Sequence, residues 1–171
     1  MTYHGPGQLV GYPLIPLGTP NLQVEQKRDS ANLPKADYIE YLRKLEATLI
    51  ATLAKLGVTG EQYPGLTGVW IQLPSPTHSR DESLMASQLP SKITSIGIKV
   101  DARGVSRHGF ALNVNTDMSY WEGIIGCGLE DYQETSLAEL PSPPPTVESV
   151  VQDVIAAIGE EFDYTMQIKL L

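Results

Sequence analysis

The stretch KITSIGIKVDARGVSRHGFALNVNTD, which spans residues 92–117, decides the fold. It contains two runs rich in β-branched and other apolar residues, over 93–100 and 109–115. Runs of this length and composition are typical of β-strands. We therefore expect these two segments to form strands of a sheet.

The segments on either side of this stretch add two helices. Over residues 37–56, one tyrosine and five leucines recur every three or four positions, which predicts an amphipathic helix. Asp37 and Glu40 fit its first turn, and Gly57 is a suitable stop. Valines and isoleucines recur in the same way over residues 147–158 and predict a second helix.

Three further segments are expected to be extended. Residues 9–17 contain prolines that favour an edge position, residues 67–73 have the composition of a strand, and residues 166–171 are placed as a last strand. The Ser- and Pro-rich residues 74–91 predict an exposed loop. Mixed strands and helices indicate an α/β class, as an α+β mixed sheet, and we expect residues 1–171 to form a single domain.

Composition argues against several classes of function. The 171 residues carry a net charge of −8, which disfavours nucleic-acid binding and attachment to anionic membranes. No apolar stretch approaches the length of a membrane span. The histidines, cysteine and acidic residues do not show the spacing of metal ligands, and the glycine-rich start lacks the pattern of a P-loop or a dinucleotide fingerprint. We expect no nucleic acid, no membrane, no metal and no cofactor.

Cys127 is the only cysteine and stands between two glycines, Gly126 and Gly128. Glycines leave backbone amides free to bind a developing oxyanion, which suits a nucleophile, but a buried structural cysteine in a tight turn fits the same residues. A nucleophilic thiol needs a basic or cationic neighbour. The residues alone leave that neighbour open among five candidates: His4, His78, His108, Lys92 and Lys99.

Five sequence blocks carry a family resemblance. They are residues 2–13 (TYHGPGQLVGYP), 67–71 (TGVWI), 92–97 (KITSIG), 108–117 (HGFALNVNTD), and 127–128 (CG) with 135–136 (TS). These blocks resemble the motifs of the lipoyl(octanoyl) transferase family and follow the family's order along nearly the whole chain. The resemblance implies the catalytic fold shared with biotin and lipoate protein ligases.

The resemblance also implies a reaction and a site. An octanoyl group on acyl carrier protein would pass to Cys127 as a thioester, and then to the lysine of a lipoyl domain, with Lys92 lowering the pKa of Cys127 and shuttling protons. The implied partners are octanoyl-acyl carrier protein, the lipoyl domains of 2-oxoacid dehydrogenases and the glycine cleavage H protein. The acyl site would be lined by the following residues: Thr2, Tyr3, His4, Ser95, Ile96, Gly97, Gly109, Phe110 and Ala111.

Two departures from the family pattern qualify these expectations. The family's Arg-Gly-Gly and the elements before it would precede Thr2, so we expect an N-terminally truncated domain. The residue before the cysteine is usually proline, and here it is Gly126, which loosens the turn. The alternatives are an inactive relative that binds lipoyl domains or acyl carrier protein, and an enzyme that moves acyl groups between lipoyl domains. We expect a monomer and a mitochondrial location, or a cytoplasmic one in a bacterium.

Overall fold

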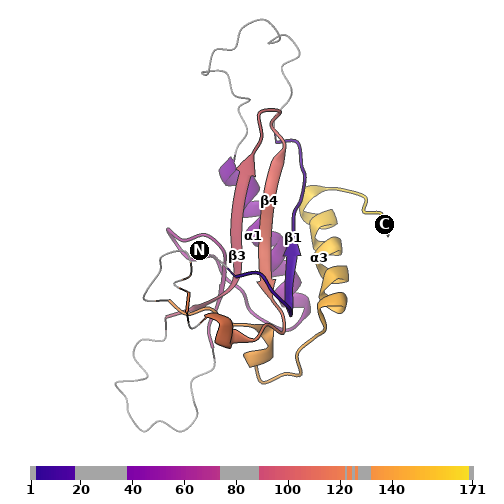
Figure 1. Ribbon diagram of the computed structural model, residues 1–171. Coiled ribbons are helices and arrows are strands. Elements are labelled where there is room, and N and C mark those ends of the chain that lie inside the picture. The colour runs from indigo at the N-terminus through magenta and orange to yellow at the C-terminus, as the bar shows by residue number, and fades with distance from the viewer. Residues whose placement is uncertain are drawn as a thin grey trace, which may run out of the picture.

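The computed structural model describes residues 3–17, 38–73, 89–121, 123–124, 126 and 132–169. Four strands form one antiparallel sheet in the order β1-β4-β3-β2. Two α-helices and two short 3₁₀-helices complete the described elements (Figure 1). Their bounds are β1 Gln8–Gly11, α1 Tyr38–Lys55, β2 Val69–Ile71, β3 Ser91–Val100, β4 Ser106–Asn113, η1 Met118–Trp121, η3 Leu137–Glu139 and α3 Val147–Phe162.

The two strands predicted within residues 92–117 are confirmed as β3 and β4, the central pair of the sheet. Both begin before their predicted starts, β3 at Ser91 and β4 at Ser106, and β4 ends at Asn113, before the predicted end at residue 115. The apolar pattern missed Ser106 because its polar side chain is fully buried. Its hydroxyl donates a hydrogen bond to the Pro13 carbonyl oxygen at 2.7 Å and accepts one from the Ile15 amide at 2.8 Å.

Both helices cover one face of the sheet and pack against each other (Figure 1). Leu49 and Leu53 of α1 meet Val150 and Val154 of α3 over the buried side chains of the strands. Removing this apolar surface from water is the main force that holds the layers together. The predicted helices and the predicted α+β class are therefore confirmed.

Helix α1 ends at Lys55, and Gly57 stops it just beyond that end, as the sequence predicts. Gly57 has a φ of 75°, which favours glycine, and the amide of Val58 bonds to the carbonyl oxygen of Leu53 at 2.9 Å. The proposed start at Asp37 lies outside the described residues. No helix of the described residues is long and apolar enough to cross a membrane.

The prediction of an edge position for residues 9–17 is also confirmed, since β1 is the outer strand beside β4. The predicted strand over 166–171 is wrong for residues 166–169, which form no strand. A left-handed residue, Asp163, turns the chain at the end of α3, and the amide of Tyr164 bonds back to Gly159 at 2.9 Å. The segment therefore leaves along α3 instead of joining the sheet.

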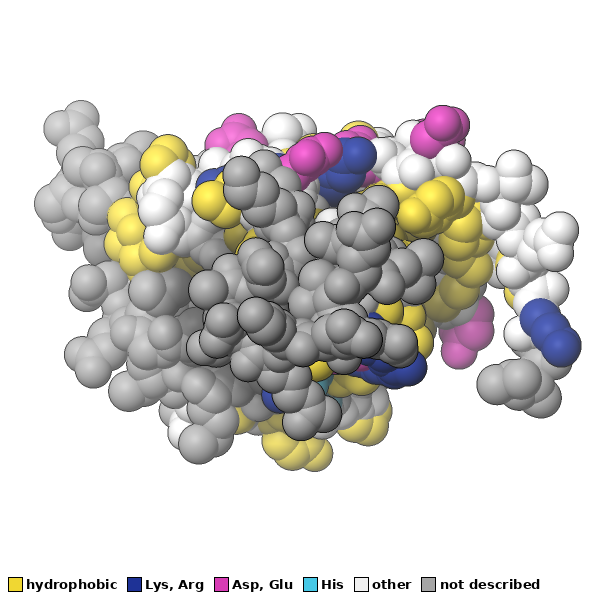
Figure 2. All heavy atoms as spheres, turned by 90° about the horizontal axis from the view of Figure 1, so that it is seen from above, with side chains coloured by type: hydrophobic (Ala, Val, Ile, Leu, Met, Phe, Trp, Pro, Cys, Tyr) yellow, Lys and Arg dark blue, Asp and Glu magenta, His cyan; other side chains and the backbone are white. Residues whose placement is uncertain are grey.

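An apolar groove of about 430 Å³ lies between β1 and α3, and Leu9, Val154 and Met166 contribute to its walls. Several apolar side chains that line it are exposed, among them Leu14 and Tyr164. In Figure 2, hydrophobic side chains reach the surface on the side of the molecule where the C-terminal segment runs out.

Candidate functional site

Lys92 lies near the start of β3 and is almost completely buried, at 3% exposure. Its Nζ atom lies 5.0 Å from the ring centroid of Trp70 on the neighbouring strand β2. Trp70 belongs to an aromatic cluster with Tyr63 and Tyr132, whose ring centroids lie 5.1 to 6.0 Å apart. A cation over the face of a tryptophan ring is attracted by the ring's quadrupole, so the aromatic cluster provides a favourable contact for the lysine side chain.

A glycine turn holds Trp70 in this position. Gly68 has a φ of 118°, and a Cβ atom on it would collide with the carbonyl oxygen of Thr94. The amide of Gly68 donates to the buried carboxylate of Glu46, at 3.2 Å, and Arg43 pairs with the same carboxylate at 2.6 Å. A buried acid on α1 therefore fixes the turn that leads into β2.

A chain of hydrogen bonds joins the first sequence block to Lys92. His4 Nδ1 bonds to Gln8 Oε1 at 2.8 Å, and Gln8 Nε2 donates to Asn113 Oδ1 at 2.8 Å. Asn113 Nδ2 donates to the carbonyl oxygen of Thr135 at 2.9 Å, and the amide of Thr135 donates to the carbonyl oxygen of Lys92 at 2.9 Å. Parts of four of the five sequence blocks thus form one connected network, and Gly68 and Trp70 bring the fifth beside it.

Glu134 was missed by the sequence reasoning. Its backbone pairs with Lys92 in an isolated parallel bridge, and its carboxyl group is largely buried, with Oε2 lacking a hydrogen-bond partner among the described residues. Burial raises the pKa of Glu134 to about 7, and the positive charge of Lys92 opposes that rise. The sequence contains no signal for it, since it is one of 20 acidic residues and follows a polar stretch.

The same carboxyl group lies against Gly126, the residue that precedes the predicted nucleophile in the sequence. Glu134 Oε1 lies 2.6 Å from the position that a Cβ atom would occupy on Gly126. Any side chain at residue 126 would therefore displace this oxygen. Cys127 itself lies outside the described residues, as does Thr2.

A cavity of about 340 Å³ gathers most of the predicted acyl-site residues. Its floor contains Gly97, which faces open space, since no atom lies within 4 Å of the position that a Cβ atom would occupy there. Tyr12 and His108 form part of its wall, with their rings edge to face and the centroids 6.1 Å apart. The predicted residues that line it are His4, Ser95, Ile96, Gly97, Gly109, Phe110 and Ala111.

The remaining candidates lie elsewhere. Tyr3 does not line this cavity, and its ring stacks on Tyr120 with a centroid distance of 5.4 Å. Lys99 is exposed on the outer half of β3, in contrast to the buried Lys92. His78 lies outside the described residues. The described residues contain no group of three or more His, Cys, Asp or Glu side chains that could hold a metal ion.

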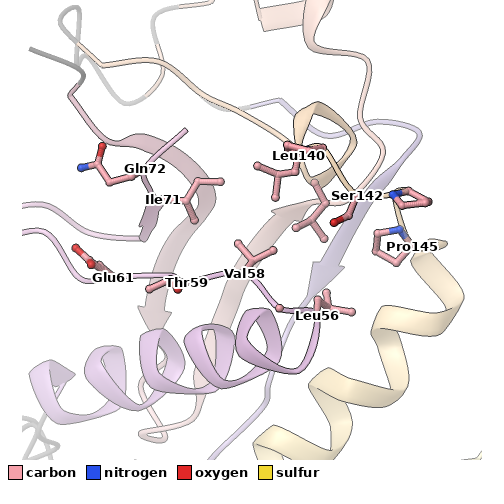
Figure 3. A pocket seen from close by; sticks show the side chains of 13 residues that line it. Leu56, Val58, Thr59, Glu61, Ile71, Gln72, Leu140, Ser142 and Pro145 are labelled. Carbon is pink, nitrogen blue, oxygen red and sulfur yellow. The ribbon is translucent and has the colours of Figure 1, made fainter. Parts of the chain in front are cut away.

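A second cavity, of about 390 Å³, lies beyond the end of α1 (Figure 3). Its walls come from the α1–β2 connection, the end of β2 and the proline-rich connector before α3. Apolar side chains such as Val58 and Leu140 line it, with Glu61 and Gln72 at one end (Figure 3). None of the predicted site residues lines this cavity, so it does not coincide with the candidate site.

Residues 1–159 match the family of lipoyl protein ligase A/B catalytic domains. The chain belongs to this family. Within the lipoyl protein ligase A/B family, it is 36% identical to the octanoyltransferase of Chloroflexus aurantiacus over 171 residues, which are 100% of this chain and 64% of that protein. It is 38% identical to the octanoyltransferase of Synechococcus elongatus over 167 residues, 98% of this chain and 58% of that protein. The chain thus spans about three fifths of the length of these relatives.

Solved structures of lipoate and biotin protein ligases share the fold. A bipartite lipoate protein ligase from Thermoplasma acidophilum matches with a TM-score of 0.56 and 14% identity, over 78% of this chain and 49% of that one. The biotin protein ligase of Aquifex aeolicus matches with a TM-score of 0.55 and 14% identity, over 92% of this chain and 53% of that one. The fold predicted from the resemblance, that of biotin and lipoate protein ligases, is therefore confirmed.

Proposed function

We propose that this protein is an octanoyltransferase that moves an octanoyl group from acyl carrier protein to a lipoyl-domain lysine through a thioester on Cys127. The observation that carries the proposal is the meeting of distant sequence blocks around Lys92, through the hydrogen bonds from His4 to Thr135. The names of relatives such as the Chloroflexus aurantiacus octanoyltransferase support it.

The proposed reaction has two acyl transfers. The Cys127 thiolate attacks the carbonyl carbon of the acyl carrier protein thioester, and the carrier thiolate leaves and takes a proton from Lys92. The neutral amine of the acceptor lysine then attacks the Cys127 thioester, and the amide forms as the Cys127 thiolate leaves. The proton released by the amine passes to the neutral Lys92, which restores the starting state. Passing through a covalent intermediate divides one difficult substitution into two easier ones.

Lys92 suits this role because it is a buried cation held against an aromatic surface. A nearby positive charge favours the thiolate over the thiol and so lowers the pKa of a cysteine. Lys99 lacks this environment, since it is exposed. The contrast favours Lys92 as the partner of Cys127.

The cavity beside β3 and β4 supplies a place for the acyl chain. Its volume of about 340 Å³ falls in the range of small-molecule sites, roughly 300–1,000 Å³. Ile96, Phe110 and Ala111 give it an apolar lining, and each methylene buried there would contribute about 0.8 kcal/mol. The polar atoms are few, and Ser95 Oγ is buried without a hydrogen-bond partner among the described residues.

Intact-protein mass spectrometry after incubation with octanoyl-acyl carrier protein tests the proposal. We expect a gain of one octanoyl group, its loss in Cys127→Ala, slower formation in Lys92→Met, and transfer to a lipoyl domain added afterwards. A folded protein that takes no octanoyl group but binds the carrier would point to the inactive relative. An adduct formed only from an octanoylated lipoyl domain would point to transfer between lipoyl domains.

The proposed partners are octanoyl-acyl carrier protein and the lipoyl domains of 2-oxoacid dehydrogenases and the H protein. The monomeric state and the mitochondrial location stay predictions, and the relatives reported above come from bacteria. Light scattering during gel filtration tests the first, and imaging of a tagged full-length protein in its own cells tests the second.

A further inference from the structure

Glu134 is fixed beside Lys92 by its backbone. The amide of Lys92 donates to the carbonyl oxygen of Gln133 at 2.8 Å, and the amide of Thr135 donates to the carbonyl oxygen of Lys92 at 2.9 Å. The two bonds involve the residues on either side of Glu134, so they fix the register of its backbone relative to β3. Main-chain hydrogen bonds therefore hold Glu134 at the candidate site.

The carboxyl group lacks hydrogen bonds that would offset its burial. Among the described residues, Oε2 is buried without a hydrogen-bond partner. Oε1 lies 2.6 Å from the position that a Cβ atom would occupy on Gly126. Burying an unpartnered carboxyl group is costly, so an apolar side chain would be the more stable choice at this position. Unpartnered buried polar groups of this kind often occur at functional sites.

Lys92 is the charged group that acts on this carboxyl group. The parallel bridge sets Glu134 beside Lys92, and Lys92 lies over the ring of Trp70. Glu134 Oε1 lies against Gly126, the residue that precedes Cys127 in the sequence. We propose that Glu134 is a positioning residue of the transfer site, which shares the charge of Lys92 and so controls how strongly that lysine favours the thiolate of Cys127. This inference rests on the proposed function.

The protonation state of Glu134 sets the direction of the effect. Burial brings the pKa of this carboxyl group to about 7, so it is neutral in mildly acidic solution and ionised in mildly alkaline solution. The ionised form competes with the thiolate for the positive charge of Lys92, whereas the neutral form leaves that charge to the thiolate. Other titratable or charged side chains near the pair, among the described residues, are Tyr63, Tyr132 and, through Gly68, the ion pair of Arg43 with Glu46.

The alkylation rate of Cys127 by iodoacetamide, measured from pH 5 to pH 9 on the full chain, tests the inference. Only one cysteine is present, so the rate reports on this thiol alone. In the wild type, we expect the rate to rise with an additional inflection near pH 7. In Glu134→Gln, the inflection should disappear, and alkylation at pH 8 should be faster by up to about tenfold, which corresponds to one pKa unit.

Controls separate charge from structure. Glu148→Gln removes the same charge from an exposed position on α3 and should leave the profile unchanged. Glu134→Asp retains an acid and should retain an inflection, which a merely structural role would not require. Superimposable profiles for the wild type and Glu134→Gln, with circular dichroism showing that both are folded, would overturn the inference.

The octanoyl-acyl carrier protein assay, run on the same preparations, separates this inference from the proposed function. If the wild type accepts no octanoyl group but Glu134→Gln loses the inflection, the coupling of Glu134 to Lys92 stands and the transfer function fails. If the wild type accepts the group and the two alkylation profiles coincide, the role of Glu134 fails and the transfer function stands.

Discussion

The Cε atom of Lys92 lies only 3.2 Å from the position that a Cβ atom would occupy on Gly68. The same Cβ atom would also collide with the carbonyl oxygen of Thr94. The TGVW block and the lysine block of the sequence are therefore fitted to each other, and residue 68 has no room for a side chain.

Gly68→Ala should destabilise the protein. The new methyl group meets a backbone oxygen that cannot move easily, and a φ of 118° is strained for alanine, so we expect a loss of about 2 kcal/mol or more in the free energy of unfolding. Urea denaturation checks it. Gly97→Ala is the matched control because nothing lies within 4 Å of its Cβ position, and an equal loss in both variants would contradict the packing argument.

The stability of the protein should depend on Glu134 and on pH. Its pKa rises from an ordinary 4.5 to about 7 on folding, so the folded state binds the proton more tightly. Between these two values the folded form holds more protons than the unfolded form, and stability falls as the pH rises. The loss reaches about 3 kcal/mol above pH 7.

Glu134→Gln removes this dependence. We expect the variant to be more stable than the wild type at pH 8, and the difference to shrink towards pH 5, in denaturation curves recorded at several pH values. A constant difference across this range would show that burial does not perturb the carboxyl group.

The effects of substitutions at Gly126 and Glu134 should depend on each other. A methyl group in Gly126→Ala would meet Glu134 Oε1 at 2.6 Å, so we expect both lower stability and an altered alkylation profile for Cys127. In a Glu134→Ala background the obstacle is gone, and the same substitution should cost much less. Gly123→Ala is the control, since no atom lies within 4 Å of its Cβ position. Additive effects in the double variant would refute the coupling.

Gly97→Val should block the acyl cavity without unfolding the protein. Gly97 lies in β3 and faces open space in the cavity, and valine is well suited to a strand. The thermal midpoint should not fall, whereas octanoyl-adduct formation should slow by about tenfold or more, as expected for a displaced substrate. Retained adduct formation would mean that the acyl chain binds elsewhere, for example in the cavity of Figure 3.

The β3–β4 connection should lose order in Asp101→Ala. The Asp101 carboxylate accepts hydrogen bonds from the amides of Arg103 and Val105, at 2.9 and 3.0 Å, and pairs with Arg107 at 2.8 Å. The bonds with Arg107 and these amides lower the pKa of Asp101 to about 2. The contribution is complete above the ordinary value of 3.8 and is lost as the pH falls through about 2.

Hydrogen exchange of the Val105 amide checks this prediction. We expect faster exchange in Asp101→Ala at pH 5, and a wild-type rate that approaches the variant's as the pH falls towards 2, after correction for intrinsic exchange. Arg103→Ala is the control, because its ion pair is exposed and its Nη2 atom lies 3.7 Å from the carboxylate.

The sequence predicted what apolar periodicity can report. Apolar spacing predicted the helices at 37–56 and 147–158 and the central strands. The glycine stop of α1 was predicted because glycine readily adopts the left-handed conformation that Gly57 has. The prediction of a last strand was wrong because an apolar composition does not show whether the segment can pair with a free edge of the sheet. The turn at Asp163 decides that, and aspartate is not a strong signal for a left-handed residue.

The candidate site was predicted only through the resemblance, and it stays a prediction. The resemblance selected Lys92 from five possible partners, and burial on the aromatic cluster now gives a physical reason for that choice. Glu134 carries no such signal, because its significance comes from the loss of water around it, which depends on residues far away in the chain. Gly126 leaves room for that carboxyl group, and the expectation that it loosens the turn stays a prediction.

The hydrogen-bonded chain from His4 to Thr135 also bears on how the protein is made. Gln8 and Asn113 are separated by 105 positions, and Asn113 must in turn reach Thr135. Chains emerge from the ribosome N-terminus first, and contacts between distant residues form slowly. Gln8 must therefore wait until Asn113, 105 positions later, has been synthesised before it finds this partner. Until then β1 lacks its neighbour β4, and the nascent chain is exposed to misfolding and to capture by chaperones.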